Sequence, residues 1–186
     1  MEEIDFYLDA AEEMMDKAIE HLQSALLKIR AGKAMPGMLE GLMVEYYGTM
    51  TPINQMSSIS TPDARTLMIK PWEKTAIHEI ERAITNSDLG LNPQNDGEQV
   101  IINIPPLTEE RRISLVKQAK HEGEQGKISV RSARHECQHE LKQLQKDGAS
   151  EDSIRVAEDE LNVLTEKHTK TIDELIKVKE EEIMTV

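Results

Sequence analysis

Residues 135–139 read His-Glu-Cys-Gln-His, a pattern that can form a zinc site on a helix. In H-E-x-x-H proteins the two histidines lie one helical turn apart and bind zinc, and the glutamate acts as the general base. A catalytic zinc also needs a third protein ligand and a sheltered open position for water. Whether this chemistry is possible therefore depends on which face of its helix the pattern occupies.

The pattern falls on the outer face of its predicted helix. Val130, Ala133, Cys137 and Leu141 follow one another at helical spacing and predict the buried stripe. At 100° per residue, His135 and His139 each lie about 160° from Cys137, so both face solvent. No third ligand is evident in the sequence. We therefore predict no metal, no cofactor and no catalysis, and we expect Cys137 to be a small core residue.

Other signals for catalysis, membrane insertion and export are also absent from the sequence. It contains no G-x-x-x-x-G-K-[ST], G-x-G-x-x-G or G-x-S-x-G pattern. No apolar run approaches the roughly 20 residues that span a bilayer, and the N-terminal MEEIDFYLDA is acidic, unlike a signal peptide. The single cysteine favours a reducing compartment. We expect a cytoplasmic protein, and the missing transit-like leader favours bacterial over organellar origin.

Prolines divide the chain into a helical and an interrupted part. All seven prolines lie between residues 36 and 106. On either side, apolar residues recur at steps of three and four, which predicts long amphipathic helices. The first helix falls within residues 1–30, the second runs from Thr108 to Lys146-Asp147-Gly148 with a core stripe that starts near Ile113, and the third starts at Ser150. The third stripe is predicted to contain Ile154, Ala157, Leu161, Leu164, His168, Leu175 and Val178.

The short connection between the second and third helices makes these two antiparallel, and the first must pack alongside both because each helix buries only one stripe. Residues 1–30 and 106–186 therefore predict an elongated antiparallel three-helix bundle.

The interrupted part has the pattern of a small α+β domain at residues 31–105. Alternating apolar residues near 44–46, 67–69 and 100–104 predict strands, and Ile77, Ile80 and Ile84 predict one helix between them. The chain enters and leaves this β/α/β insertion at two neighbouring crossings, at residues 30–33 and 104–106. Two crossings at one place predict a hinge, formed by Ala31, Gly32, Ile104, Pro105 and Pro106.

Charge is distributed unevenly over the chain, whose formal net charge is −13. Residues 111–134 contain seven Lys or Arg and only two acids, whereas residues 147–186 contain twelve acids and five Lys or Arg. Five of the basic residues fall within about 100° of one helical arc, namely Lys117, Lys120, Lys127, Arg131 and Arg134. This pattern fits a solvated face paired with acids on neighbouring helices, and equally a phosphate-binding stripe on an acidic body.

Five segments of the chain resemble one known family. They read VEYYG at 44–48, TPINQ at 51–55, RTLMIKPW at 65–72, SDLGLNP at 87–93 and PPLTEERR at 105–112. In this order, and between such helices, they resemble the ribosome recycling factors of bacteria and organelles. The resemblance extends over the entire chain, and VEYYG and PPLTEERR are its most specific parts.

The resemblance implies an L-shaped, tRNA-like, non-enzymatic protein that works as a monomer. Such factors bind the large ribosomal subunit after termination and contact its ribosomal RNA through basic residues of the bundle. Elongation factor G then uses GTP to drive the separation of the subunits, with release of mRNA and tRNA, while the small domain swings about the hinge.

The resemblance also indicates which residues bind ribosomal RNA. Arg30 and Lys33 match the family's R-x-G-R segment, with lysine in place of the last arginine. Arg111 and Arg112 end PPLTEERR, and Arg131 and Arg134 match an R-x-x-R pattern on the middle helix. His135 stands where a second arginine is common, so the first histidine of the zinc-like pattern occupies an RNA-facing position. With Lys117 and Lys127 from the basic arc, the predicted RNA-binding set is Arg30, Lys33, Arg111, Arg112, Lys117, Lys127, Arg131 and Arg134.

Two other functions remain as alternatives at this point. A coiled-coil scaffold or chaperone could use the insertion to recognise protein partners, and a zinc hydrolase would use His135 and His139.

Overall fold

The computed structural model describes residues 2–185 and divides into two compact units. One unit contains residues 1–31 and 109–186, and the other contains residues 32–108. The boundaries predicted from the sequence differ from these by one to three residues. Part of the difference comes from close packing between Gly32 and Leu107, which both belong to the smaller unit. The two residues are so close that a β-carbon added to Gly32 would lie 2.8 Å from Leu107 Cγ. Both chain crossings are therefore packed against each other in the smaller unit.

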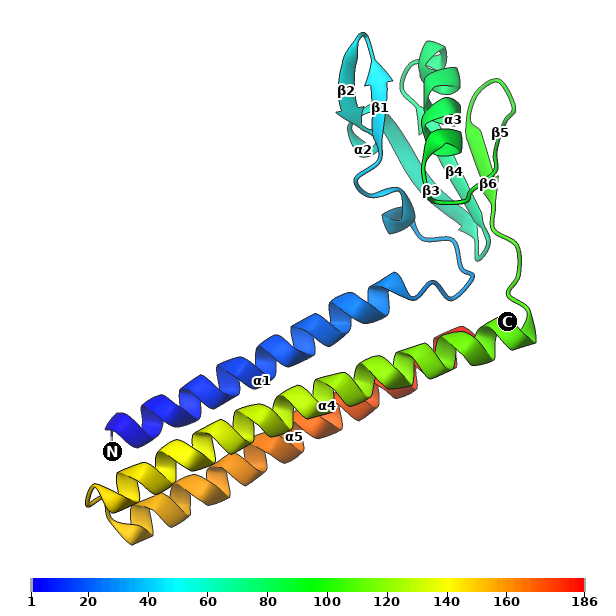
Figure 1. Cartoon of the computed structure of the whole chain (residues 1–186). Coiled ribbons are helices and arrows are strands. Elements are labelled where there is room, and N and C mark those ends of the chain that lie inside the picture. Colours follow the sequence, from blue (N-terminus) through cyan, green and yellow to red (C-terminus); the bar gives the residue numbers. More distant parts are fainter. Residues whose placement is uncertain (1, 186) are drawn as a thin grey trace. The chain divides into compact units, whose positions relative to one another are not determined.

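The larger unit is the predicted bundle of three long helices. They are α1 (Glu2–Lys28), α4 (Glu109–Lys146) and α5 (Glu151–Met184), which lie side by side in Figure 1. The turn between α4 and α5 contains Gly148, whose φ of +104° is a conformation that favours glycine. Because that turn is short, α5 runs antiparallel to α4 and parallel to α1.

The bundle core is mainly aliphatic, and His168 of α5 adds a buried polar side chain that contacts Asp16 of α1. Leu8, Met15 and Leu22 of α1 are buried, as are Leu141 of α4 and Leu161 of α5.

His168 was predicted on the core stripe and is indeed buried, with 2% of its surface exposed. Its Nδ1 lies 2.7 Å from the Leu164 carbonyl oxygen, and its Nε2 lies 2.8 Å from the Asp16 carboxylate of α1. Each ring nitrogen therefore lies within hydrogen-bond distance of an oxygen, one on the helix itself and one on α1.

The predicted stripe of α5 was wrong at its C-terminal end. Val178 is exposed, whereas Lys179 is buried. Six residues after the buried Ile172, Val178 has turned about 120° away from it, whereas seven residues bring Lys179 back to within about 20°. The lysine stem covers the core, and its Nζ reaches Glu182 at 3.3 Å. Ile113 of α4 is likewise exposed, and the buried stripe begins at Leu115.

The smaller unit contains two antiparallel sheets and one main helix. β1 (Met43–Tyr46) and β2 (Thr49–Pro52) form a hairpin, whose turn residues Tyr47 and Gly48 both have positive φ. This is the backbone that a two-residue hairpin turn requires. The larger sheet has the order β3-β4-β6-β5, with every neighbouring pair antiparallel. Its strands are β3 (Ser57–Asp63), β4 (Thr66–Pro71), β5 (Pro93–Asn95) and β6 (Val100–Asn103).

One helix closes the core of this unit. α3 (Ile77–Asn86) contributes Ile80 and Ile84 to a buried cluster that also contains Leu67 and Ile69 of β4 and Ile102 of β6. Figure 1 shows α3 lying across the sheet. The remaining short elements are α2 (Ile53–Met56) and two 3-10 turns, η1 (Pro36–Leu39) and η2 (Lys74–Ala76). The predicted strands near 44–46, 67–69 and 100–104 and the helix with Ile77, Ile80 and Ile84 are all present.

Candidate RNA-binding surface

The middle helix carries its basic residues beside the buried stripe. Val130, Ala133 and Cys137 face the core of the bundle. Arg131 is exposed and Arg134 is half-buried. The guanidinium Nε of Arg134 is buried without a hydrogen-bond partner among residues 2–185. A buried donor without a partner is costly, and Nε itself is too well covered for an external phosphate to reach it.

Lys127 is paired with acids, one of them on a neighbouring helix, as in the first of the two interpretations of the basic arc. Its Nζ lies 2.6 Å from Asp173 on α5 and 3.7 Å from Glu124 one turn away, and only 22% of its side chain is exposed. The hydrogen bond to Asp173 raises the pKa of Lys127, with smaller contributions from the charges of both acids. Lys127 therefore serves first as a link between α4 and α5.

Two more cations of the arc have acidic neighbours, but their pairs are more exposed. Arg131 Nη2 lies 3.9 Å from Glu124, and Lys120 Nζ lies 3.2 Å from Glu180 on α5. Exposed pairs of this kind contribute at most about 1 kcal/mol and weaken with salt. A phosphate can therefore compete for Arg131 and Lys120.

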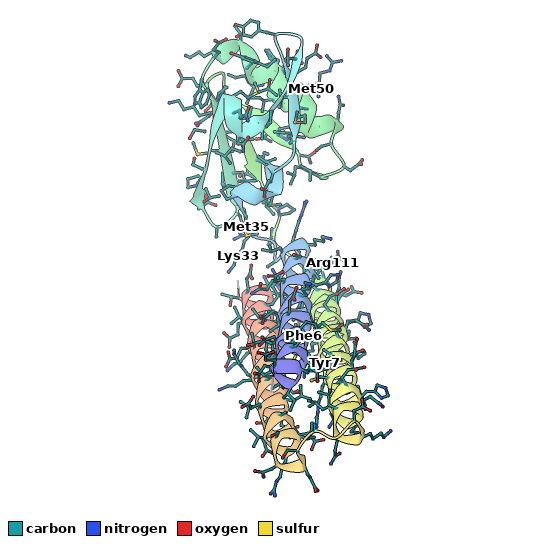
Figure 2. All side chains as sticks on the ribbon, turned by 90° about the vertical axis from the view of Figure 1, so that its left-hand side faces the viewer. Phe6, Tyr7, Lys33, Met35, Met50 and Arg111 are labelled. Atoms are coloured by element: carbon teal, nitrogen blue, oxygen red, sulfur yellow. The ribbon has the colours of Figure 1, made fainter. Side chains whose placement is uncertain are left out.

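The remaining predicted cations lie at the other end of the helix and at the chain crossings. Arg111 and Lys117 are exposed on α4, and Figure 2 shows Arg111 at the end of the bundle where α4 begins. Arg112 donates from Nη1 to the Met184 carbonyl oxygen at 3.2 Å and so ties α4 to the end of α5. Arg30 is exposed just after α1. Lys33 is half-buried and belongs to the smaller unit.

The predicted hinge residues are less free than the sequence suggested. Ile104 is buried in the core of the smaller unit, and its backbone N–H donates to the Arg65 carbonyl oxygen at 2.8 Å. Gly32 has a φ of +72°. Pro105 and Pro106 are exposed, and Ala31 falls in the bundle unit. The hinge prediction therefore narrows to Ala31 on one crossing and to residues after Ile104 on the other.

The zinc-like pattern lies as expected on the outer face of α4. His135 and His139 are exposed, and Cys137 is buried. Burial, together with the charge of Glu140, raises the pKa of the Cys137 thiol to about 11. A thiol that stays protonated is a poor nucleophile and a poor metal ligand. Residues 2–185 contain no group of three His, Cys, Asp or Glu side chains placed to hold a metal ion.

Comparisons with known proteins show the family to which the chain belongs. A family model described as ribosome recycling factor matches residues 22–184. The chain belongs to the ribosome recycling factor family. The ribosome-recycling factor of Amoebophilus asiaticus is 59% identical and that of Cytophaga hutchinsonii is 52% identical, each over 100% of both chains.

Solved structures of recycling factors are also similar to this chain. A solution structure of the ribosome recycling factor is 35% identical, with a TM-score of 0.80 and full coverage of both chains. Another match is 40% identical with a TM-score of 0.63, over 98% of this chain and 99% of the other. It is described as T. thermophilus ribosome recycling factor and E. coli elongation factor G bound to the E. coli post-termination complex.

Sequence reasoning missed the acids that occupy part of this surface. Asp173 is 46 residues from Lys127, so no local spacing connects the two. Glu124 precedes Lys127 by three residues, a spacing that brings side chains together on a helix and could have indicated their pairing.

Proposed function

We propose that this chain recycles ribosomes after translation termination. It binds the large subunit of the post-termination ribosome and, with elongation factor G and GTP, promotes dissociation of the subunits and release of mRNA and tRNA. The observation that carries the proposal is identity of 52–59% to ribosome-recycling factors over the whole length of both chains.

The chain contributes binding and positioning, and GTP is consumed by its partner. The buried Cys137 thiol and the exposed His135 and His139 support a non-enzymatic role. None of the helices in residues 2–185 is long and apolar enough to cross a membrane. The protein acts in the cytoplasm as a monomer.

The basic residues of the bundle unit contact ribosomal RNA in this proposal. The contacts come from Arg30, Arg111, Arg112, Lys117, Arg131 and Arg134, with Lys33 added from the smaller unit. The exposed and weakly paired Arg131, with Arg134 three residues further along the same helix, supports this assignment on α4. The whole chain has a net charge of −13. Its acidic surfaces outside these basic residues therefore disfavour other orientations on RNA.

Subunit splitting of post-termination ribosomes tests the function directly. Ribosomes stalled at a stop codon are mixed with the chain, elongation factor G and GTP, and light scattering reports separation of the subunits. The expected result is splitting that requires all three components. If the chain remains in the supernatant when ribosomes are pelleted and causes no splitting, the scaffold alternative is favoured and this proposal fails.

Single substitutions test the RNA contacts. Replacing Arg131 or Arg134 by Ala removes about one phosphate contact and is expected to weaken ribosome binding by roughly 1–3 kcal/mol and to reduce the log–log salt slope by about one. His135→Arg is expected to strengthen binding. Arg155→Ala is the matched control, because Arg155 is an exposed arginine on α5 outside the basic arc. Equal effects of Arg134→Ala and Arg155→Ala would contradict the assignment.

A flexible joint between the units completes the proposal. Spin labels at two exposed positions, Ser58 in the smaller unit and Val163 in the bundle unit, report the distances between the units. A broad distance distribution that narrows on the ribosome is expected. A single narrow distance in the free protein would refute the hinge. The native Cys137 is buried and does not compete for the label at neutral pH.

A further inference from the structure

A groove with an apolar floor lies between α1 and α5 of the bundle. Its main part has a volume of about 580 Å³ and a floor formed by Leu8, Val156, Val163 and Leu164. A second hollow of about 340 Å³ shares Leu8 and Val156 with it and continues to Ile4. Because the two hollows share these residues, they form one continuous feature, the α1–α5 groove.

Two valines of the floor are open to solvent. Val156 is 54% exposed and Val163 is 65% exposed. Seven residues of α-helix separate them by about 10 Å, or two turns. A single exposed valine needs no explanation. Here, however, the two valines lie in line within one hollow and, together with the partly covered leucines, offer an apolar strip as long as two helical turns.

Carboxylates line both sides of this strip. The residues that line the groove include six acids and no lysine or arginine. Lys167 reaches one of these acids, Glu12, at 3.6 Å at one end of the groove. The six acids are Asp5, Asp9 and Glu12 of α1 and Asp152, Asp159 and Glu160 of α5.

The charge of the rim determines what can occupy the groove. RNA and anionic lipid are repelled by six carboxylates. A second copy of this chain carries the same acidic rim and a net charge of −13, so two copies repel each other as well. A cationic partner with apolar side chains of its own satisfies both the floor and the rim.

We propose that the α1–α5 groove binds a basic, amphipathic helical segment of another protein. Helix-in-groove recognition places apolar residues at i, i+3 or i+4, and i+7 into such a strip, and the two-turn spacing of Val156 and Val163 matches that repeat. Lysines and arginines beside the apolar residues then meet the carboxylates on α1 and α5. The proposal goes beyond ribosome recycling and does not use the basic arc of α4.

Peptide binding to the full chain tests the proposal. The probe is a fluorescein-labelled synthetic helix of about three heptads, with leucine at the a and d positions and lysine at most others. Anisotropy should show binding that weakens as salt is raised. Val163→Ser should weaken it by about tenfold, the value of one buried aliphatic side chain. Val178→Ser should leave it within about twofold, because Val178 is similarly exposed on the same helix, at 63%, but lies outside the groove.

A charge reversal gives an independent readout. Glu160→Lys should weaken binding and make its salt dependence shallower, whereas Glu174→Lys, an exposed control outside the groove, should change it little. Equal weakening by groove and control variants would show unspecific attraction to an acidic protein and overturn the proposal.

Three further outcomes would also overturn it. The first is that the lysine-rich peptide does not bind, and the second is that the chain binds an all-glutamate version of the peptide or a short RNA more tightly. The third is that the chain sediments as a dimer and that Val163→Ser abolishes this dimer. Subunit splitting is measured separately, so failure here leaves the recycling function standing.

Discussion

Two glycines in the middle of α4 are predicted to respond oppositely to the same substitution. Gly123 and Gly126 are both buried on the core stripe of the helix. Replacing a glycine inside a helix by alanine stabilises the fold by roughly 0.5–1 kcal/mol when the added methyl group has room. The structure provides that room at only one of the two positions.

Side chains of the neighbouring helices determine how much room an added methyl group has at each position. At Gly126 the nearest atoms to an added β-carbon are Ile172 Cδ1 at 3.4 Å and Leu22 Cδ2 at 3.6 Å, which are ordinary van der Waals contacts. At Gly123 they are Ile176 Cγ1 at 2.7 Å and Cδ1 at 2.9 Å, so Ile176 has to move. Overpacking of this kind costs about 1–3 kcal/mol. We expect Gly126→Ala to raise stability by up to about 1 kcal/mol and Gly123→Ala to lower it by up to about 2 kcal/mol.

Urea unfolding measures this difference, with far-ultraviolet circular dichroism reporting the helical bundle. Fluorescence of Trp72 follows the smaller unit separately, which matters because a chain of two units need not unfold in one step. In an Ile176→Ala background the contacting atoms are gone, so Gly123→Ala should become neutral or stabilising. A double-mutant cycle should therefore give a coupling of about 1–3 kcal/mol. Additive effects, or the same sign at both glycines, would refute the packing argument.

Three further predictions concern the polar contacts of the bundle. Asp16→Ala removes the oxygen that lies 2.8 Å from His168 Nε2 and should lower the free energy of unfolding by about 1–3 kcal/mol, whereas Asp9→Ala, on the exposed side of α1, should change it little in the same urea titration. The pKa of the Cys137 thiol is raised to about 11, so at pH 8 this thiol should react with iodoacetamide far more slowly than an exposed thiol. It should react at the ordinary rate only in urea, and fast reaction of the folded chain would contradict its burial. Glu124→Gln should strengthen ribosome binding by about twofold to fivefold, since the acid competes with phosphate for Arg131; weaker binding would show that Glu124 positions Arg131 instead.

Helical periodicity predicted the bundle because each long helix buries one continuous stripe. The ends of α4 and α5 follow the proline-free segments and the Gly148 turn closely. The stripe failed at two helix ends: at the start of α4, where Ile113 is exposed, and at Lys179, because a pattern built from apolar residues passes over a lysine and selects Val178. The two core glycines of α4 were missed for the same reason.

The smaller unit was predictable in its centre but less so at its edges. Apolar residues alternate clearly along β4 and β6, because every second side chain enters the same core. These side chains are Leu67, Ile69, Val100 and Ile102. β5 consists of Pro93, Gln94 and Asn95 and pairs only with β6, so its sequence lacks the alternation of a buried strand. Its place in the sheet depends on backbone pairing, which side-chain patterns do not encode.

The cations of α4 show what a charge pattern on one helix leaves undetermined. Helical spacing places Lys127 and Arg131 on the same arc of α4. Their surroundings differ, however, because Asp173 on α5 contacts Lys127 and not Arg131. Only 22% of the Lys127 side chain is exposed, against 61% for Arg131, so salt screens the short Lys127–Asp173 contact less than the longer contact of Arg131 with Glu124. A phosphate that approaches this face therefore displaces Glu124 from Arg131 more readily than it displaces Asp173 from Lys127. Thus Arg131 and Arg134 are the first contacts expected on RNA, and Lys127 ties the helix that presents them to α5.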